Sequence, residues 1–242
     1  MRLWKPILFS TPMVPAILDG RKTQTRRVIV PQPKGYAHAW SDWLEPGDVY
    51  FDLMGGLHKA VQSRGRNKRA AGELTTVPFA PPWPVGTRLW VRETWKPWWD
   101  AHLYCTVRFR ADDAIIKPEL PDDQAGFRFA AECDAVKLGD AWHPSIFMAK
   151  WAARIGLEVT AVRCERVQDI TEADAIAEGI DPREVAARGW TDARTGFRIL
   201  WDSLNAKRGY GWGANPWVFA YGFKLLSTDY AKTQRLMTED AK

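Results

Sequence analysis

The sequence lacks the residue patterns on which metal enzymes commonly depend. Its three cysteines form no C-x-x-C pair, and its four histidines form no H-x-H, H-x-x-x-H or H-x-x-E-H pattern. A zinc site of the usual kind needs ligands at such spacings. We therefore expect no metal and no cofactor, so that any chemistry must use Lys, Thr, Glu, Tyr or Arg.

Other common signatures are absent too. The chain has no Walker A sequence, no G-x-G-x-x-G fingerprint and no G-x-S-x-G nucleophile elbow, so nucleotide-loop enzymes and common serine hydrolases are unsupported. No apolar run approaches the roughly 20 residues that span a bilayer, and residues 1–7 do not form a secretory signal. Three unpaired cysteines indicate a reducing compartment. We predict a cytoplasmic protein without a membrane partner.

What the sequence does contain fits a soluble globular domain. The chain has 242 residues, 46% of them hydrophobic and 26% charged, which suits one large domain. Its formal net charge of +5 permits an anionic or nucleic-acid partner without requiring one. Fourteen tryptophans are unusual, and although most large aromatic rings pack in cores, they also stack on bases.

The order of the expected elements indicates an α+β fold. Apolar runs and alternation predict strands at residues 7–9, 28–30, 49–51, 86–95, 105–110, 127–131, 155–162 and 217–223. Helical spacing and capping residues predict helices at 13–18, 171–178 and 197–204. Strands and helices do not alternate regularly, so a compact mixed β-barrel is the expected architecture.

One stretch, Gly20–Arg27, concentrates reactive side chains. It holds four cations and two threonines between a helix that ends at Gly20 and a strand that begins at Val28. Burial and neighbouring positive charge lower the pKa of a lysine, and a neutral Lys22 can then activate a threonine hydroxyl as a nucleophile. Spacing alone leaves open the alternative of a solvated basic loop.

Two carboxylates are candidate partners for this stretch. Glu178 lies in the last turn of a helix that begins at Thr171, where the helix dipole disfavours an anion by roughly 0.3–1 kcal/mol. It must be solvated or held by a cation. Glu93 continues the inward-facing row of Leu89 and Val91 if the strand extends that far, and lies in a turn if the alternation ends at Val91.

Four segments resemble the ASCH domain, a PUA-like β-barrel family. Residues 20–26 resemble the first seven positions of its G-x-K-T-x-T-x-R signature, and residues 84–91, 157–180 and 217–223 resemble its later strands and helix. The W-V-R-E-T-W and A-x-x-E-G-I segments are similar to those of longer bacterial and phage members. The resemblance implies one ASCH/PUA-like domain over residues 1–226, with insertions at about 31–84 and 96–145, and a polar C-terminal tail at 227–242.

The resemblance also implies an activity. Small bacterial ASCH proteins are amidohydrolases that remove the acyl group from N4-acetylcytidine with a Lys, a Thr and a Glu. Those roles fall on Lys22 as general base, Thr25 as nucleophile, and Glu178 as orienting group and proton donor. Arg26 would then stabilise the oxyanion, Trp95 would stack on the pyrimidine, and Glu93 or Ser10 would bind its polar edge. We expect a monomer that acts on a modified nucleoside or nucleobase.

Two alternatives stay open because other ASCH proteins bind or cleave RNA. An RNA-binding module without turnover would use the net charge, the tryptophans and the basic run at residues 64–69. A metal-independent ribonuclease would use Lys22 and Ser145 with Tyr50 or Tyr210. The combination of Lys, Thr and Glu favours the amidohydrolase, since a pure binder has no use for a helix-terminal acid facing its cations.

Overall fold

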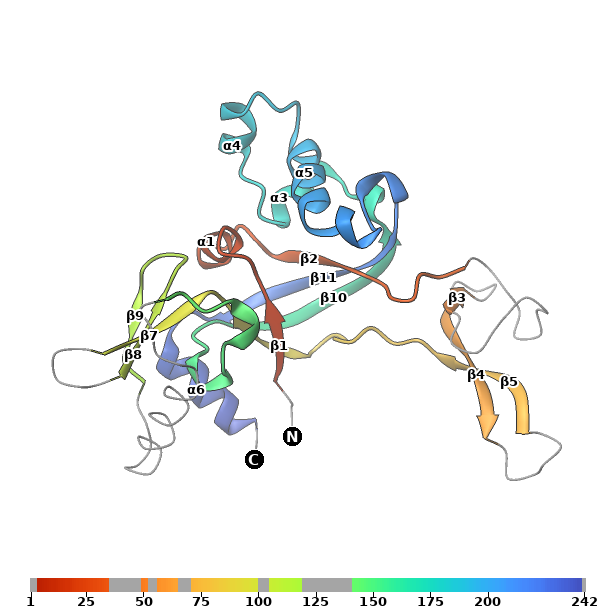
Figure 1. Cartoon of the computed structure of the whole chain (residues 1–242), viewed down its shortest axis with the longest axis horizontal. Coiled ribbons are helices and arrows are strands. Elements are labelled where there is room, and N and C mark those ends of the chain that lie inside the picture. Colours follow the sequence, from red (N-terminus) through yellow and green to blue (C-terminus); the bar gives the residue numbers. More distant parts are fainter. Residues whose placement is uncertain are drawn as a thin grey trace.

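A computed structural model describes residues 4–34, 49–51, 56–64, 71–99, 105–118 and 141–240. These residues form a mixed α+β fold with one five-stranded sheet, two three-stranded sheets and short helices (Figure 1). None of the described helices is both long and apolar enough to cross a membrane.

The five-stranded sheet carries the main core. Its strands, in spatial order, are β1 (Lys5–Leu8), β6 (Arg88–Arg92), β10 (Gly156–Arg166), β11 (Trp217–Ser227) and β2 (Gln24–Val28). Only the β1–β6 pair is parallel. Alternate residues such as Leu89, Val91, Leu157 and Val159 are fully buried on one face, as the two-residue period of a strand requires.

The expected closed barrel is not present in the described residues. There, β1 pairs with β6 alone and β2 pairs with β11 alone, so the two outer strands leave the sheet open. The chain leaves β1 for α1 (Met13–Leu18), and the buried Val14 and Ile17 of that helix belong to the main core cluster.

The reactive stretch is half strand, contrary to the expectation of a loop followed by a strand at residues 28–30. Strand β2 begins at Gln24 and ends at Val28, and its backbone pairs with residues 218–222 of β11. Pairing with β11 overrides the polar, loop-like composition of this segment. Gly20 ends the α1 turn with φ +74°, as expected for the residue after a helix.

Three helices gather beside β2 (Figure 1). They are α3 (Glu172–Ala177), α4 (Pro182–Ala187) and α5 (Ala193–Asn205). Thr171 caps α3 by accepting from the Asp174 N–H at 3.1 Å, as predicted. Gly179 ends α3 at φ +101°, and a Cβ there would approach the Lys22 side chain to 3.4 Å. A glycine is thus needed where α3 meets the reactive stretch.

The two expected insertions each contain a small sheet. The first holds β3 (Val49–Phe51), β4 (Leu57–Arg64) and β5 (Ala71–Pro78), which project away from the main sheet (Figure 1). The second holds β7 (Trp95–Trp99), β8 (Cys105–Phe109) and β9 (Ile115–Ile116), which confirms the strand predicted at 105–110. The strand predicted at 127–131 and positions 65–69 of the basic run lie outside the described residues.

Short 3-10 turns complete the described elements. They are Ser145–Phe147, Lys150–Ala152, Val167–Asp169, Ala206–Arg208 and Trp212–Ala214.

The polar C-terminal tail is an ordered and largely helical part of the domain. Residues Tyr230–Glu239 form α6, which begins at its capping residue Asp229. Thr233 donates to the Arg154 carbonyl at 2.8 Å, and Met237 packs in a second core cluster. Asp240 accepts from the Trp4 indole N–H at 2.7 Å. These contacts depend on distant residues, so the polar composition of the tail did not reveal them.

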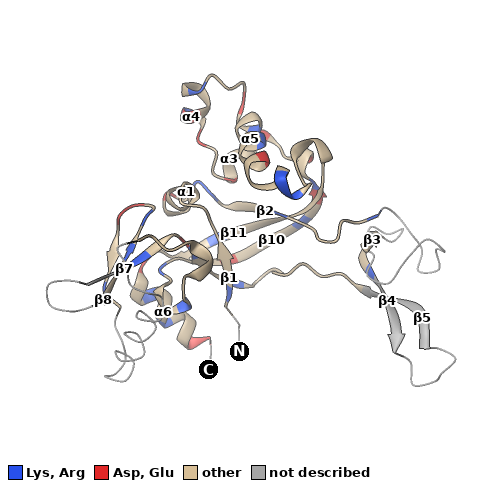
Figure 2. Ribbon diagram, viewed as in Figure 1, with Lys and Arg blue, Asp and Glu red and all other residues tan. Residues whose placement is uncertain are grey.

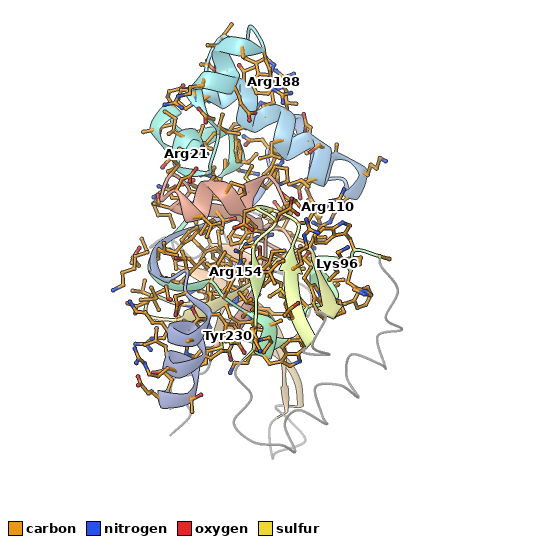
Figure 3. All side chains as sticks on the ribbon, turned by 90° about the vertical axis from the view of Figure 1, so that its left-hand side faces the viewer. Arg21, Lys96, Arg110, Arg154, Arg188 and Tyr230 are labelled. Carbon is orange, nitrogen blue, oxygen red and sulfur yellow. The ribbon has the colours of Figure 1, made fainter. Side chains whose placement is uncertain are left out.

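A buried charge cluster joins the main sheet to the β7–β9 sheet. The Arg154 guanidinium binds both carboxylate oxygens of Glu93, at 2.9 and 2.8 Å, and both oxygens of Asp112, at 2.8 and 2.9 Å. Figure 3 shows Arg154 near the middle of the molecule, above Tyr230 of α6. Burial raises the pKa of Glu93, and Arg154 opposes that shift. This cluster explains how an inward-facing Glu93 is tolerated.

We expect Arg154→Met to lower the free energy of unfolding by about 3–5 kcal/mol, because Glu93 would stay buried without a counter-charge. Urea unfolding would measure the loss. The double variant Arg154→Met/Glu93→Gln should recover part of it, because a neutral amide needs no cation. Arg235→Met, which removes an exposed 4.0 Å pair with Glu239, is the matched control. A loss below about 1 kcal/mol in Arg154→Met would contradict the assigned role.

Candidate active site

A buried ion pair between Lys22 and Glu178 lies at the centre of the candidate site. Lys22 Nζ is 2.9 Å from Glu178 Oε2, and it also donates to the Glu178 carbonyl at 2.6 Å and to the Gln24 carbonyl at 2.9 Å. Both residues are about 4% exposed. The prediction that a cation such as Lys22 faces the carboxylate at the end of α3 is confirmed. The three acceptors hold the ammonium group in one place.

Arg26 holds the other side of the same carboxylate. Its Nη1 donates to Glu178 Oε1 at 3.1 Å, and its Nε and Nη2 both donate to Glu165 at 3.0 and 2.7 Å. Asp174 lies 3.2 Å from Nη2. All three nitrogens of Arg26 therefore face carboxylates, and its side chain is fully buried. This geometry makes Arg26 the support of Glu178.

The pKa of Lys22 is lowered from its usual value. Burial is the main cause, because it penalises the charged ammonium, and the nearby positive charges of Arg27 and Arg26 act in the same direction. The negative charge of Glu178 opposes them. Arg21, which the sequence grouped with these cations, instead pairs with Asp19 and Asp181. Lys22 is thus the cation of the stretch that is best suited to proton transfer.

Thr25 lies on β2, opposite Tyr221 of β11, and is buried. Thr23 precedes the strand and is exposed, and its backbone pairs with residues Ala177 and Phe223. The structure therefore separates the two threonines of the stretch by environment. Only Thr25 shares a cavity with Lys22 and Glu178.

That cavity has a volume of about 510 Å³ and lies between the end of β1, β2 and α5. Its polar wall contains Ser10, Lys22, Thr25, Arg26, Arg27, Ser145, Glu178, Asn205 and Arg208. Its apolar wall contains Leu8, Phe9, Met13, Val28, Phe197, Leu200, Trp201 and Leu204. A flat aromatic molecule with a few polar groups suits such a lining.

Five of the predicted substrate or catalytic residues line this cavity, namely Ser10, Lys22, Thr25, Arg26 and Glu178. Ser10 does not cap α1, which begins after Pro12 without a side-chain cap. Its hydroxyl is therefore not committed to the helix. The position of Ser10 agrees with a role at the polar edge of a ligand.

Glu93 and Trp95 are not part of this site, contrary to the expectation from the sequence. Glu93 is fully buried against Arg154. Trp95 is 1% exposed and packs edge-on against Trp151 in the second core cluster. Neither residue lines the cavity. Glu93 is buried, as the alternation of Leu89 and Val91 favoured, although β6 ends at Arg92, and the interior that Glu93 and Trp95 face is packed.

Helix α5 contributes to the wall of the cavity, which the sequence did not predict. The spacing of Phe197, Leu200, Trp201 and Leu204 indicated core packing, and Phe197 and Trp201 are indeed buried. The same face also lines the cavity. A signal was present, because the stripe continues at helical spacing into Asn205 and Arg208, where apolar residues give way to polar ones.

The residues of the ribonuclease alternative are only partly brought together. Ser145 lines the cavity with Lys22, whereas Tyr210 does not, and the Tyr50 side chain lies outside the described residues. Nowhere in the described part of the chain do three His, Cys, Asp or Glu side chains form a group suited to a metal ion.

Comparison of the chain with protein-family models, with curated proteins and with solved structures finds no match.

The lowered pKa of Lys22 predicts how stability depends on pH. Between this lowered pKa and the usual lysine value of about 10.4, the unfolded chain binds more protons than the folded one, so the folded state gains stability as pH rises. We expect the free energy of unfolding of the wild type, relative to Lys22→Met, to increase with pH across that window, as measured by urea unfolding.

Glu178→Gln provides the companion measurement. Glu178 raises the pKa of Lys22, so the pKa of Lys22 should be lower still in Glu178→Gln. The stability difference between Glu178→Gln and Glu178→Gln/Lys22→Met should therefore begin to increase at a lower pH than the difference between wild type and Lys22→Met. A difference between wild type and Lys22→Met that stays flat, or falls, would contradict the lowered pKa.

Proposed function

We propose that the protein is an amidohydrolase that removes the acyl group from N4-acylated cytidine, giving cytidine and a carboxylate. The observation that carries the proposal is the buried Lys22–Glu178 pair on the wall of a cavity that also contains Thr25. The sequence resemblance to ASCH amidohydrolases supports it, and the proposal includes that family's PUA-like fold, a cytoplasmic location and a monomeric state.

In the first step, the neutral form of Lys22 takes the hydroxyl proton of Thr25. Thr25 Oγ1 attacks the acyl carbon, which forms a tetrahedral intermediate with a negative oxygen. The lowered pKa of Lys22 supports this role, because it raises the fraction of neutral amine near neutral pH. The ammonium that results lies beside the intermediate and stabilises its charge.

In the second step, Lys22 returns its proton to the N4 nitrogen as the C–N bond breaks, and cytidine leaves. Water, activated by the again neutral Lys22, then hydrolyses the acyl ester of Thr25 and releases the carboxylate. Glu178 orients Lys22 throughout, because its carboxylate and its carbonyl both accept from Nζ. We assign the proton donor role to Lys22 in place of Glu178, since each Glu178 oxygen already faces a cation.

The role of Arg26 changes in the same way. Its three nitrogens face Glu165, Asp174 and Glu178, so it fixes Glu178 and does not reach the oxyanion. Phe9, Phe197 and Trp201 are the aromatic side chains of the cavity. They replace Trp95 as the surface for the pyrimidine, and Ser10 stays a candidate for its polar edge.

The RNA-binding alternative gains support from the positive charge of the cavity, which further contains Arg27 and Arg208. Phosphate groups are attracted by such charge in any sequence context. A module that only binds would, however, have no need to bury Lys22 against Glu178 behind that surface. Turnover separates the two functions.

We expect the purified protein to release cytidine from N4-acetylcytidine without added metal, as measured by chromatography. Lys22→Ala should lower kcat by roughly 10²–10⁴-fold, the usual contribution of a general base. Thr25→Val should abolish turnover, because it replaces the nucleophilic oxygen with a methyl group of similar size.

Thr23→Val is the matched control, since Thr23 is exposed and outside the cavity. It should keep wild-type turnover. Mass spectrometry after a brief reaction should detect acetyl-Thr25 in the wild type. Turnover that survives both Lys22→Ala and Thr25→Val would refute the mechanism, and tight RNA binding without release of cytidine would favour the alternative.

A further inference from the structure

Arg27 carries a positive charge that no carboxylate neutralises within the described residues. Its Nη2 donates to the Leu8 carbonyl at 2.6 Å, its guanidinium lies 5.8 Å from the centre of the Phe9 ring, and its buried Nε has no acceptor. Glu178 is the carboxylate that acts on its pKa, but both oxygens of Glu178 already accept from Lys22 and Arg26. A partly buried cation in this state is costly unless an anion joins it.

Arg208 adds a second cation to the same cavity. It ends the turn that follows α5, is exposed, and contacts Asn205 through a long 3.4 Å hydrogen bond. Burial is the main cause of the lowered pKa of Arg27, and the charge of Arg208 lowers it further, which places the two guanidinium groups within electrostatic range. Figure 2 shows basic residues both on the segment that enters β2 and on the turn after α5.

Within the described part of the chain, the two arginines that are fully buried are neutralised by carboxylates. Arg26 faces three carboxylates and Arg154 faces two. Arg208 alone would have an ordinary explanation, because a cation near the end of a helix interacts favourably with the helix dipole. Arg27 has no such explanation, since it lies on a strand. Two like charges on one cavity wall repel each other, and a bound anion between them would remove that cost.

We propose that Arg27 and Arg208 form an anion subsite that binds the phosphate group of a nucleotide, so that the acylated substrate is a nucleoside phosphate. This inference rests on the proposed function, because it assigns the substrate class of the same cavity. Guanidinium groups present several N–H donors in a plane, which suits phosphate oxygens.

The subsite adjoins the reacting group. Thr25 and Arg27 are two residues apart on β2, so their side chains leave the same face of the strand roughly 7 Å apart. Arg208 approaches from the α5 side of the cavity. A single small molecule can therefore present an acyl group to Thr25 and an anionic group to the arginines.

Calorimetric titration of the wild-type protein with cytidine, cytidine 5′-monophosphate and cytidine 3′-monophosphate tests the subsite through binding alone. We expect one of the two nucleotides to bind about ten- to a hundredfold more tightly than cytidine, as a charge-assisted hydrogen bond allows. The two nucleotides together show which phosphate position is recognised. The preference should shrink as salt concentration rises, because ions screen exposed charges.

Arg208→Gln should move the ratio of the two dissociation constants, nucleoside over nucleotide, toward one, while Arg27, which remains, should keep part of the preference. Arg198→Gln is the matched control, because Arg198 is exposed on the same helix α5 and does not line the cavity. It should keep the wild-type ratio. Equal affinity for cytidine and both nucleotides, no binding of either nucleotide, or equal loss in both variants would overturn the inference.

Turnover distinguishes this failure from that of the proposed function. Release of cytidine from N4-acetylcytidine without any nucleotide preference would retain the amidohydrolase and reject the phosphate subsite. The protein could instead prefer N4-succinylcytidine to the acetylated nucleotides and lose this preference in Arg208→Gln. That result would mean that the arginines bind a carboxylate on the acyl group, and it would also reject the phosphate subsite. Nucleotide preference in binding without any turnover would keep the subsite and reject the amidohydrolase.

Discussion

The burial of one carboxylate organises this protein. Glu178 stands at the end of α3 that disfavours an anion, and it is removed from water, so it requires positive charge on both sides. Lys22 and Arg26 supply that charge from a single short stretch. Since one precedes β2 and the other lies within it, the three residues join β2 and the stretch before it to the end of α3. The same ion pairs place a lysine of lowered pKa on the wall of a cavity. The stability of this part of the fold and its proposed chemistry therefore depend on the same contacts.

Local rules predicted the parts of the site that depend on local structure. The conflict between Glu178 and its helix dipole predicted a facing cation, and Gly20 and Gly179 end their helices as glycines do. What failed was the placement of inward-facing residues. Alternation favoured an inward-facing Glu93, and the resemblance placed Glu93 and Trp95 at the substrate, but neither tells a packed core from a cavity. That difference depends on Arg154, Asp112 and Trp151, which are distant in sequence and carry no pattern that links them to β6.

Architecture was predicted less well than the individual elements. Most strands of the main sheet occur near their expected positions, yet the sheet is open in the described residues, where β1 pairs with β6 alone and β2 with β11 alone. The face of α5 shows a related limit. Helical spacing predicts that a stripe is buried, but the same stripe packs against a core cluster along part of its surface and lines a cavity along the rest. Helical spacing does not tell these surfaces apart, and Leu204 of the stripe is 56% exposed.

The pairing of β2 with β11 also determines when the site can assemble. Thr25 lies opposite Tyr221, so β2 must wait for a partner strand that is synthesised roughly 200 residues later. Pairings this distant in sequence form slowly, because the chain must first close a long loop. During translation, the ionic stretch of residues 20–27 therefore leaves the ribosome long before β11 and α3 can bury it. Its polar character keeps that waiting segment compatible with water, which an apolar edge strand in the same position would not be.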